Sequence, residues 1–361
     1  MMQCLLAVCL LLQAQAAAPT VPPEAQAFLQ DGIEAEKRHD FDAAIAAFRK
    51  AADLAPSSSI VFYHLGGAYM KKGDYAAAIP PLKHAAEMNP DSLPIHQMLG
   101  FALLAAGYAA DAIPQLEIAH EYGALGIAQL QNGQPTEAVA NLQAALAKTP
   151  GDPDLLYYLS RAAASLSSQS LDKLLSTFSD SARGHQAKGQ TYFGMKLYPE
   201  AVKEYQQALA LRPDLPGLHL ELGQVYAANS AWAKAEEQFR LEAKLQPGNA
   251  EAAYRLGEAL LQQGKMKEAA EELRRSDSLH PDMPETLYSL GRALTSGEPT
   301  AAQQAFESVI ALEKETPLAA QAYLALAGIH RKQGKTELAA HEMEEFRRIQ
   351  SATNTPAPTA P

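Results

Sequence analysis

The sequence predicts an all-α protein, a right-handed α-solenoid of about ten antiparallel helix-turn-helix units. Three observations support this prediction. The chain is rich in Ala, Leu, Gln and Glu and poor in Val and Ile, which favours helices over strands. It resembles itself at a period of about 34 residues. Small residues and prolines recur at fixed places in that period, as expected for stacked helical hairpins.

The clearest unit runs from Ser59 to Ser92. Its first half has residues at spacings i, i+3, i+4 and i+7, which form one stripe along a helix: Phe62, Leu65, Gly66 and Tyr69. A second stripe follows after a short polar segment at 72–74, and it consists of Tyr75, Ala78, Leu82 and Ala85. The unit therefore predicts two amphipathic helices that form an antiparallel hairpin.

The small residues and the proline of this unit have distinct physical roles. Gly66 and Ala78 are small because the two helices cross there, and a larger side chain would hold their axes apart. Gly73 ends the first helix, where a left-handed backbone conformation costs glycine little. Pro90 follows the second helix, where its missing N–H group breaks no helical hydrogen bond.

The same three positions recur along the chain. The small residue of the first helix appears as Gly32, Gly66, Gly100, Gly126, Ser160, Gly189, Gly223, Gly257, Gly291 and Ala327. The small residue of the second helix appears as Ala44, Ala78, Ala112, Ala138, Ala201, Ala235, Ala269, Ala302 and Ala339. The closing proline appears as Pro56, Pro90, Pro150, Pro213, Pro247 and Pro281.

These residues resemble the tetratricopeptide repeat family, whose units share this pattern of Leu-Gly, aromatic, Ala and Pro positions. The resemblance covers about residues 25–350. It implies a stack of helical hairpins that binds other proteins or peptides through its concave face.

The repeat is interrupted in the middle of the chain. Between Gly100 and Gly126 the third unit loses most of its loop and the end of its second helix, around 119–121. The fifth unit has a serine-rich second helix near Leu171 to Phe178 without the expected Ala. This segment either bends the solenoid or is absorbed with little bending, and both alternatives remain open.

We therefore divide the chain into five parts. Residues 1–18 are interpreted as a signal peptide, 25–118 as repeats 1–3, 119–181 as irregular repeats 4–5, 182–350 as repeats 6–10, and 351–361 as a disordered tail of Pro, Thr and Ala.

The first residues contain an apolar run from Cys4 to Leu12 followed by small residues at Ala14 and Ala16, which is typical of a signal peptide. The run is too short to span a bilayer. No Lys or Arg precedes it, so an apolar capping helix is the alternative. We expect an exported protein, periplasmic or secreted, with no integral membrane segment after the signal is cleaved.

Charge and motifs argue against two classes of function. A formal net charge of −11 without a basic cluster argues against binding to nucleic acid.

Both cysteines, Cys4 and Cys9, fall in the predicted signal peptide, so thiolate sites are not expected after cleavage. Phosphate-loop, dinucleotide and nucleophile-elbow motifs are absent from the sequence. The nearest zinc motif, at His341 and Glu342, lacks its second His, and we interpret it as a solvated face. We expect no catalytic residue, no cofactor and no metal.

The predicted binding surface is the face of the first helices that lies about 100° from the packing stripe. Aromatic and Arg residues, which anchor many interfaces, are common on it. Its residues are Tyr63, Phe101, Tyr157, Arg161, Gln190, Phe193, Gln224, Tyr254, Glu258, Tyr288 and Arg292. Any one of these aromatic side chains could instead cover a neighbouring helix.

The sequence thus favours a non-enzymatic scaffold that binds a peptide or protein partner in its concave groove. The alternative is a structural module of a cell-envelope machine for secretion, pilus assembly or polysaccharide export. A cofactorless activity in the irregular segment 119–181 is a third hypothesis, without a residue to support it.

Overall fold

The computed structural model describes residues 21–354. Over that range the chain forms nineteen α-helices and no β-strand. The helices belong to two compact units, and the boundary between Ser170 and Leu171 falls inside helix α9. The predicted all-α solenoid fold is confirmed. The predicted signal peptide at 1–18 lies outside the described residues and stays a prediction.

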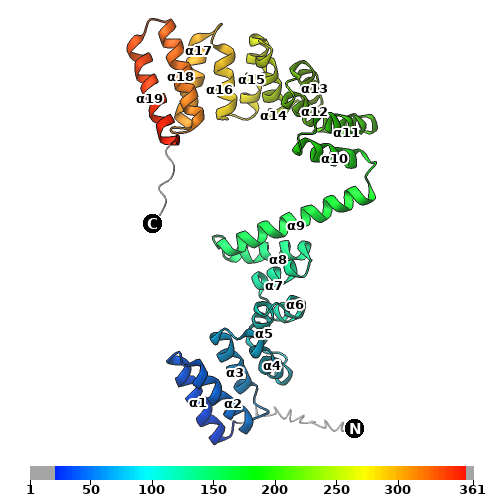
Figure 1. Ribbon diagram of the computed structural model, residues 1–361, viewed down its shortest axis with the longest axis vertical. Helices are drawn as coiled ribbons and strands as arrows, with labels where there is room; N and C mark the ends of the chain where they lie inside the picture. Colours follow the sequence, from blue (N-terminus) through cyan, green and yellow to red (C-terminus); the bar gives the residue numbers. More distant parts are fainter. Residues whose placement is uncertain (1–20, 355–361) are drawn as a thin grey trace, which may run out of the picture. The chain divides into compact units, whose positions relative to one another are not determined.

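Unit 1 contains four helical hairpins followed by most of α9 (Figure 1). Its helices are α1 (Pro23–Lys37), α2 (Phe41–Leu54), α3 (Ser59–Lys72), α4 (Tyr75–Met88), α5 (Leu93–Ala105), α6 (Ala109–Ile118), α7 (Tyr122–Gln131), α8 (Pro135–Lys148) and α9 (Pro153–Thr177).

Unit 2 contains five hairpins. Its helices are α10 (Ala182–Gly194), α11 (Tyr198–Leu211), α12 (Leu218–Ala228), α13 (Trp232–Leu245), α14 (Ala250–Gln262), α15 (Met266–Leu279), α16 (Pro284–Leu294), α17 (Pro299–Leu312), α18 (Pro317–Lys332) and α19 (Thr336–Asn354).

The two helices of a hairpin cross closely at the small residue of the first helix. A Cβ atom added to Gly223 of α12 would lie 2.5 Å from Cε1 of Phe239 in α13. The same close approach recurs at eight glycines, and it pairs Gly32 with Phe48, Gly66 with Leu82, Gly100 with Leu116, Gly126 with Leu142, Gly189 with Tyr205, Gly223 with Phe239, Gly257 with Leu273 and Gly291 with Phe306. The predicted reason for small residues at this position is therefore confirmed.

The turns between the two helices follow the prediction from Gly73. This residue has a φ of 85° at the end of α3, and the neighbouring Asp74 accepts a hydrogen bond from the backbone N–H of Ala77. Lys196 and Ser230 occupy the corresponding turns with φ values of 60° and 57°, so a left-handed residue is used even where glycine is missing. All six closing prolines lie outside the helices, as predicted.

The first helices of successive hairpins contact one another as well as their own second helices. In unit 2 these contacts join α10 to α12, α12 to α14, α14 to α16, and α16 to α18. In unit 1 they join α3 to α5 and α5 to α7. The first helices therefore form a continuous layer from α10 to α18 in unit 2 and from α3 to α7 in unit 1, and side chains from neighbouring hairpins can contribute to one surface.

The structure corrects the prediction for the fifth repeat. The sequence placed a second helix near Leu171 to Phe178, but the chain continues as one helix of 25 residues from Pro153 to Thr177. No Gly, Pro or Asn follows Pro153 within this segment to stop a helix. The described residues therefore form nine hairpins and one single helix, where the sequence predicted about ten hairpins.

The structure also bears on three other parts of the predicted organisation. Helix α6 has 10 residues whereas α4 has 14, so the predicted loss of the end of this second helix is confirmed. The predicted loss of most of the loop is wrong, because residues 119–121 still separate α6 from α7. Repeat 4 is a regular hairpin of α7 and α8, although the sequence grouped it with the irregular part. The predicted tail begins too early, because α19 continues to Asn354; the rest of that tail lies outside the described residues.

The crossing predicts opposite effects for two Gly→Ala substitutions. Gly223→Ala should lower the free energy of unfolding by about 1–2 kcal/mol, because the strain of the new methyl group exceeds the gain in helix propensity. Gly328 lies in α18 with nothing within 4 Å of an added Cβ atom, so Gly328→Ala should stabilise the protein by about 0.5–1 kcal/mol. Urea unfolding of both variants checks this, and equal effects would contradict the close crossing.

Candidate functional site

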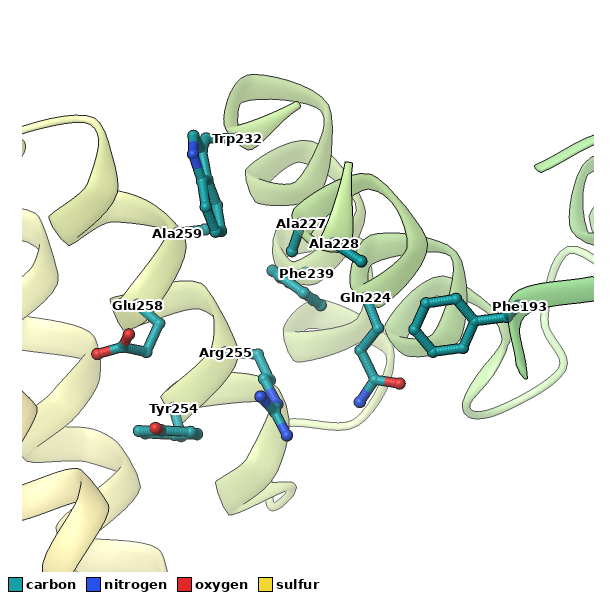
Figure 2. Close-up of a pocket in the computed structure, with 10 residues that line it drawn as sticks. All are labelled: Phe193, Gln224, Ala227, Ala228, Trp232, Phe239, Tyr254, Arg255, Glu258 and Ala259. Atoms are coloured by element: carbon teal, nitrogen blue, oxygen red, sulfur yellow. The ribbon is translucent and has the colours of Figure 1, made fainter. Parts of the chain in front are cut away.

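A groove in unit 2 gathers side chains from three consecutive first helices (Figure 2). We call it the unit-2 groove. Its volume is about 460 Å³, which is in the range of ligand-binding pockets. It is lined by Phe193, Gln224, Ala227, Ala228, Trp232, Phe239, Tyr254, Arg255, Glu258 and Ala259.

The shape of the unit-2 groove follows from the repeat. Phe193, Gln224 and Tyr254 lie on α10, α12 and α14, the first helices of three successive hairpins. Ala227 and Ala228 at the end of α12 are small and leave an apolar space between the larger side chains (Figure 2). The groove thus offers an apolar surface with polar groups around it.

The charged groups of the unit-2 groove differ in how well they are paired. Nε of Arg255 donates to Oε1 of Glu251 over 3.0 Å, within one helix. Nη1 of Arg292 lies 3.9 Å from Oε1 of Glu258, a distance that is too long for a hydrogen bond. Burial raises the pKa of Tyr254, and the negative charge of Glu258 raises it further. The carboxylate of Glu258 is therefore the less satisfied charge in the groove.

A second groove lies in unit 1, with a volume of about 380 Å³. We call it the unit-1 groove. It is lined by Glu36, Tyr63, His64, Gly67, Met70, Lys71, Pro94, Gln97, Met98 and Phe101. Nζ of Lys71 lies 2.9 Å from Oε2 of Glu36, so its charges are paired, and burial lowers the pKa of His64, which favours the neutral ring. Two methionines and two large aromatic residues are among its lining side chains.

The structure brings six of the predicted binding residues into these two grooves. Phe193, Gln224, Tyr254 and Glu258 line the unit-2 groove, and Tyr63 and Phe101 line the unit-1 groove.

Three other predicted residues lie beside the unit-2 groove. Nε2 of Gln190 on α10 donates to Oε1 of Glu221 on α12 over 3.0 Å, so it joins two first helices. Arg292 approaches Glu258, as described above. The ring of Tyr288 packs against Phe306 with centroids 5.6 Å apart, so part of this side chain covers a neighbouring helix.

The last two predicted residues lie elsewhere. Tyr157 and Arg161 are exposed on α9, with the guanidinium carbon of Arg161 5.8 Å from the centre of the Tyr157 ring. Neither of them lines the unit-1 groove. They form a local contact of their own.

Sequence reasoning missed several residues that line the unit-2 groove. Arg255 directly follows Tyr254, and a wider stripe on the first helix would have included it. Trp232 begins α13, a second helix, so no stripe on the first helices could have found it. Ala227 and Ala228 give no sequence signal, because alanine is common throughout the chain.

Several histidines outside the grooves join the two helices of a hairpin. Nδ1 of His185 on α10 lies 2.7 Å from Oε2 of Glu204 on α11, and His96 and His219 make similar bonds to Gln115 and Gln238. Glu342 is buried and hydrogen-bonded to His330, which corrects our interpretation of its segment as a solvated face. Within residues 21–354, no group of three or more His, Cys, Asp or Glu is arranged to hold a metal ion.

The described part of the chain also has no helix that is both long enough and apolar enough to cross a bilayer.

Comparison with solved structures finds similar helical arrays. A MamA fragment from Desulfovibrio magneticus RS-1 is 19% identical, with 48% of this chain and 97% of that chain covered and a TM-score of 0.46. YrrB, described as a TPR protein with an unusual peptide-binding site, is 19% identical over 50% and 92% of the chains, with a TM-score of 0.45. Yeast Tom70 is 15% identical over 90% and 92%, with a TM-score of 0.39. These values are too low to support an inference about function.

Comparison with protein-family models is more informative. A tetratricopeptide repeat model matches residues 29–92, 124–170, 241–284 and 292–352, which together exceed half of the chain. A second model, described as a TPR repeat, matches residues 180–230. Curated protein sequences yield no match. The chain belongs to the tetratricopeptide repeat family.

Proposed function

We propose that the protein is a non-enzymatic scaffold that binds an extended segment of a peptide or protein partner along its first-helix layer. The unit-2 groove is the observation that carries this proposal. Its aromatic residues Phe193, Trp232 and Tyr254, together with Arg255, are of the types that anchor protein interfaces.

The layout of the groove suits an extended ligand. Side chains from α10, α12 and α14 line it, so one bound segment would contact three hairpins at once. Many modest contacts then add up along the segment. The titratable groups among its lining residues are one carboxylate, one guanidinium and one phenol, which serve to bind and orient a ligand.

We also propose that the protein is exported to the periplasm or secreted. Support for this comes from the sequence of residues 1–18, where an apolar run precedes small residues.

Removing an aromatic anchor should weaken peptide binding. We expect Phe193→Ala to lower the affinity of the full chain for peptides selected from an immobilised array of random sequences by about tenfold or more. Leu241→Ala is the control, since Leu241 is 41% exposed on α13 and does not line the groove. Circular dichroism confirms that both variants fold. Equal affinities for wild type, Phe193→Ala and Leu241→Ala would contradict a ligand site in the groove.

Trp232 provides an independent readout, because it is the single Trp of the sequence and lines the unit-2 groove. Adding a selected peptide should reduce the quenching of tryptophan fluorescence by acrylamide, because the ligand covers the indole. A peptide that binds without changing this quenching would occupy another surface, and the proposal for the unit-2 groove would be wrong.

A further inference from the structure

Glu258 has an unmet capacity to accept hydrogen bonds. Its Oε1 atom is shielded from solvent and accepts no hydrogen bond from any residue in the range 21–354. Arg292 is the cationic residue that approaches it, and Nη1 stays 3.9 Å away. The side chain of Glu258 as a whole is 24% exposed and lines the groove. Buried or half-buried carboxylates normally obtain such partners.

Arg255, the other charged residue of the groove, already has a hydrogen-bonded partner. Its Nε atom is hydrogen-bonded to Glu251, and its guanidinium carbon lies 5.5 Å from the centre of the Tyr254 ring. Figure 2 shows the side chains of Arg255 and Glu258 pointing in different directions from α14. Of the two charged residues that line the groove, Glu258 is therefore the one whose charge lacks a hydrogen-bonded partner.

The charge of Glu258 influences two tyrosines. Burial raises the pKa of both Tyr254 and Tyr288, and the charge of Glu258 acts on both phenols in the same direction. A carboxylate near aromatic rings attracts a cation, because the ring faces and the carboxylate are both electronegative. An acidic ligand group would instead be repelled.

We infer that the segment bound in the unit-2 groove presents a Lys or Arg side chain to Glu258. A large apolar side chain of the same segment occupies the space beside Ala227 and Ala228, between Phe193 and Trp232 (Figure 2). Arg292 is 40% exposed and moves into solvent when the ligand cation takes its place. This inference rests on the proposed function and names the class of ligand: a peptide with a basic residue near a large apolar one.

The test compares wild type with Glu258→Gln on the same array of random peptides, using the full chain. Peptides that bind the wild type should be enriched in Lys or Arg near a large apolar residue. Glu258→Gln should lower their affinity by about tenfold or more, because a charge-assisted hydrogen bond is lost. Replacing the basic residue of a selected peptide by norleucine should abolish the difference between the two proteins. Glu344→Gln, on the exposed side of α19, is the matched control and should bind like the wild type.

Three different results would contradict different parts of this proposal. If Glu258→Gln keeps the wild-type preference for basic peptides, the role of Glu258 is wrong and the scaffold proposal stands. If the selected peptides show no basic enrichment, the ligand class is wrong. If wild type binds no peptide of the array, both the scaffold proposal and this inference fail.

Discussion

The close crossing of the two helices in each hairpin is the constraint on which the rest of the structure depends. At eight crossings a glycine faces a Leu, Phe or Tyr side chain, and an added Cβ atom would lie 2.3–2.9 Å from it. The large partner is buried in each case, as Phe239 and Tyr205 illustrate with 1% of their surface exposed. The glycine therefore sets the distance between the helices, while the large residue supplies the buried apolar surface.

This constraint also positions the candidate site. Because each first helix is held close to its own second helix, the first helices of unit 2 come into contact with one another and form one layer. Phe193, Gln224 and Tyr254 then project from three adjacent helices into one groove. The helices alone build this surface. A single side chain on it, such as Glu258, can therefore set which ligands it prefers.

The periodic part of the fold could be predicted because its signals are local and repeated. Gly66, Gly73 and Pro90 each have a physical role that their spacing reveals. The continuous helix α9 was missed, because its serines suggested an interruption, although the lack of Gly, Pro and Asn between Leu155 and Thr177 is a signal for one unbroken helix. The groove was predicted in part. Trp232 comes from a second helix, and the incomplete pairing of Glu258 depends on a distance to Arg292 that sequence spacing does not give.

A double-mutant cycle at Gly223 and Phe239 tests the crossing most directly. In the Phe239→Val background the ring atoms that face the new methyl group are gone, so Gly223→Ala should no longer destabilise the protein. We expect a coupling energy of about 1 kcal/mol or more from urea unfolding of the four proteins. If Gly223→Ala lowers the free energy of unfolding equally in both backgrounds, the close helix crossing does not set the structure of the hairpin.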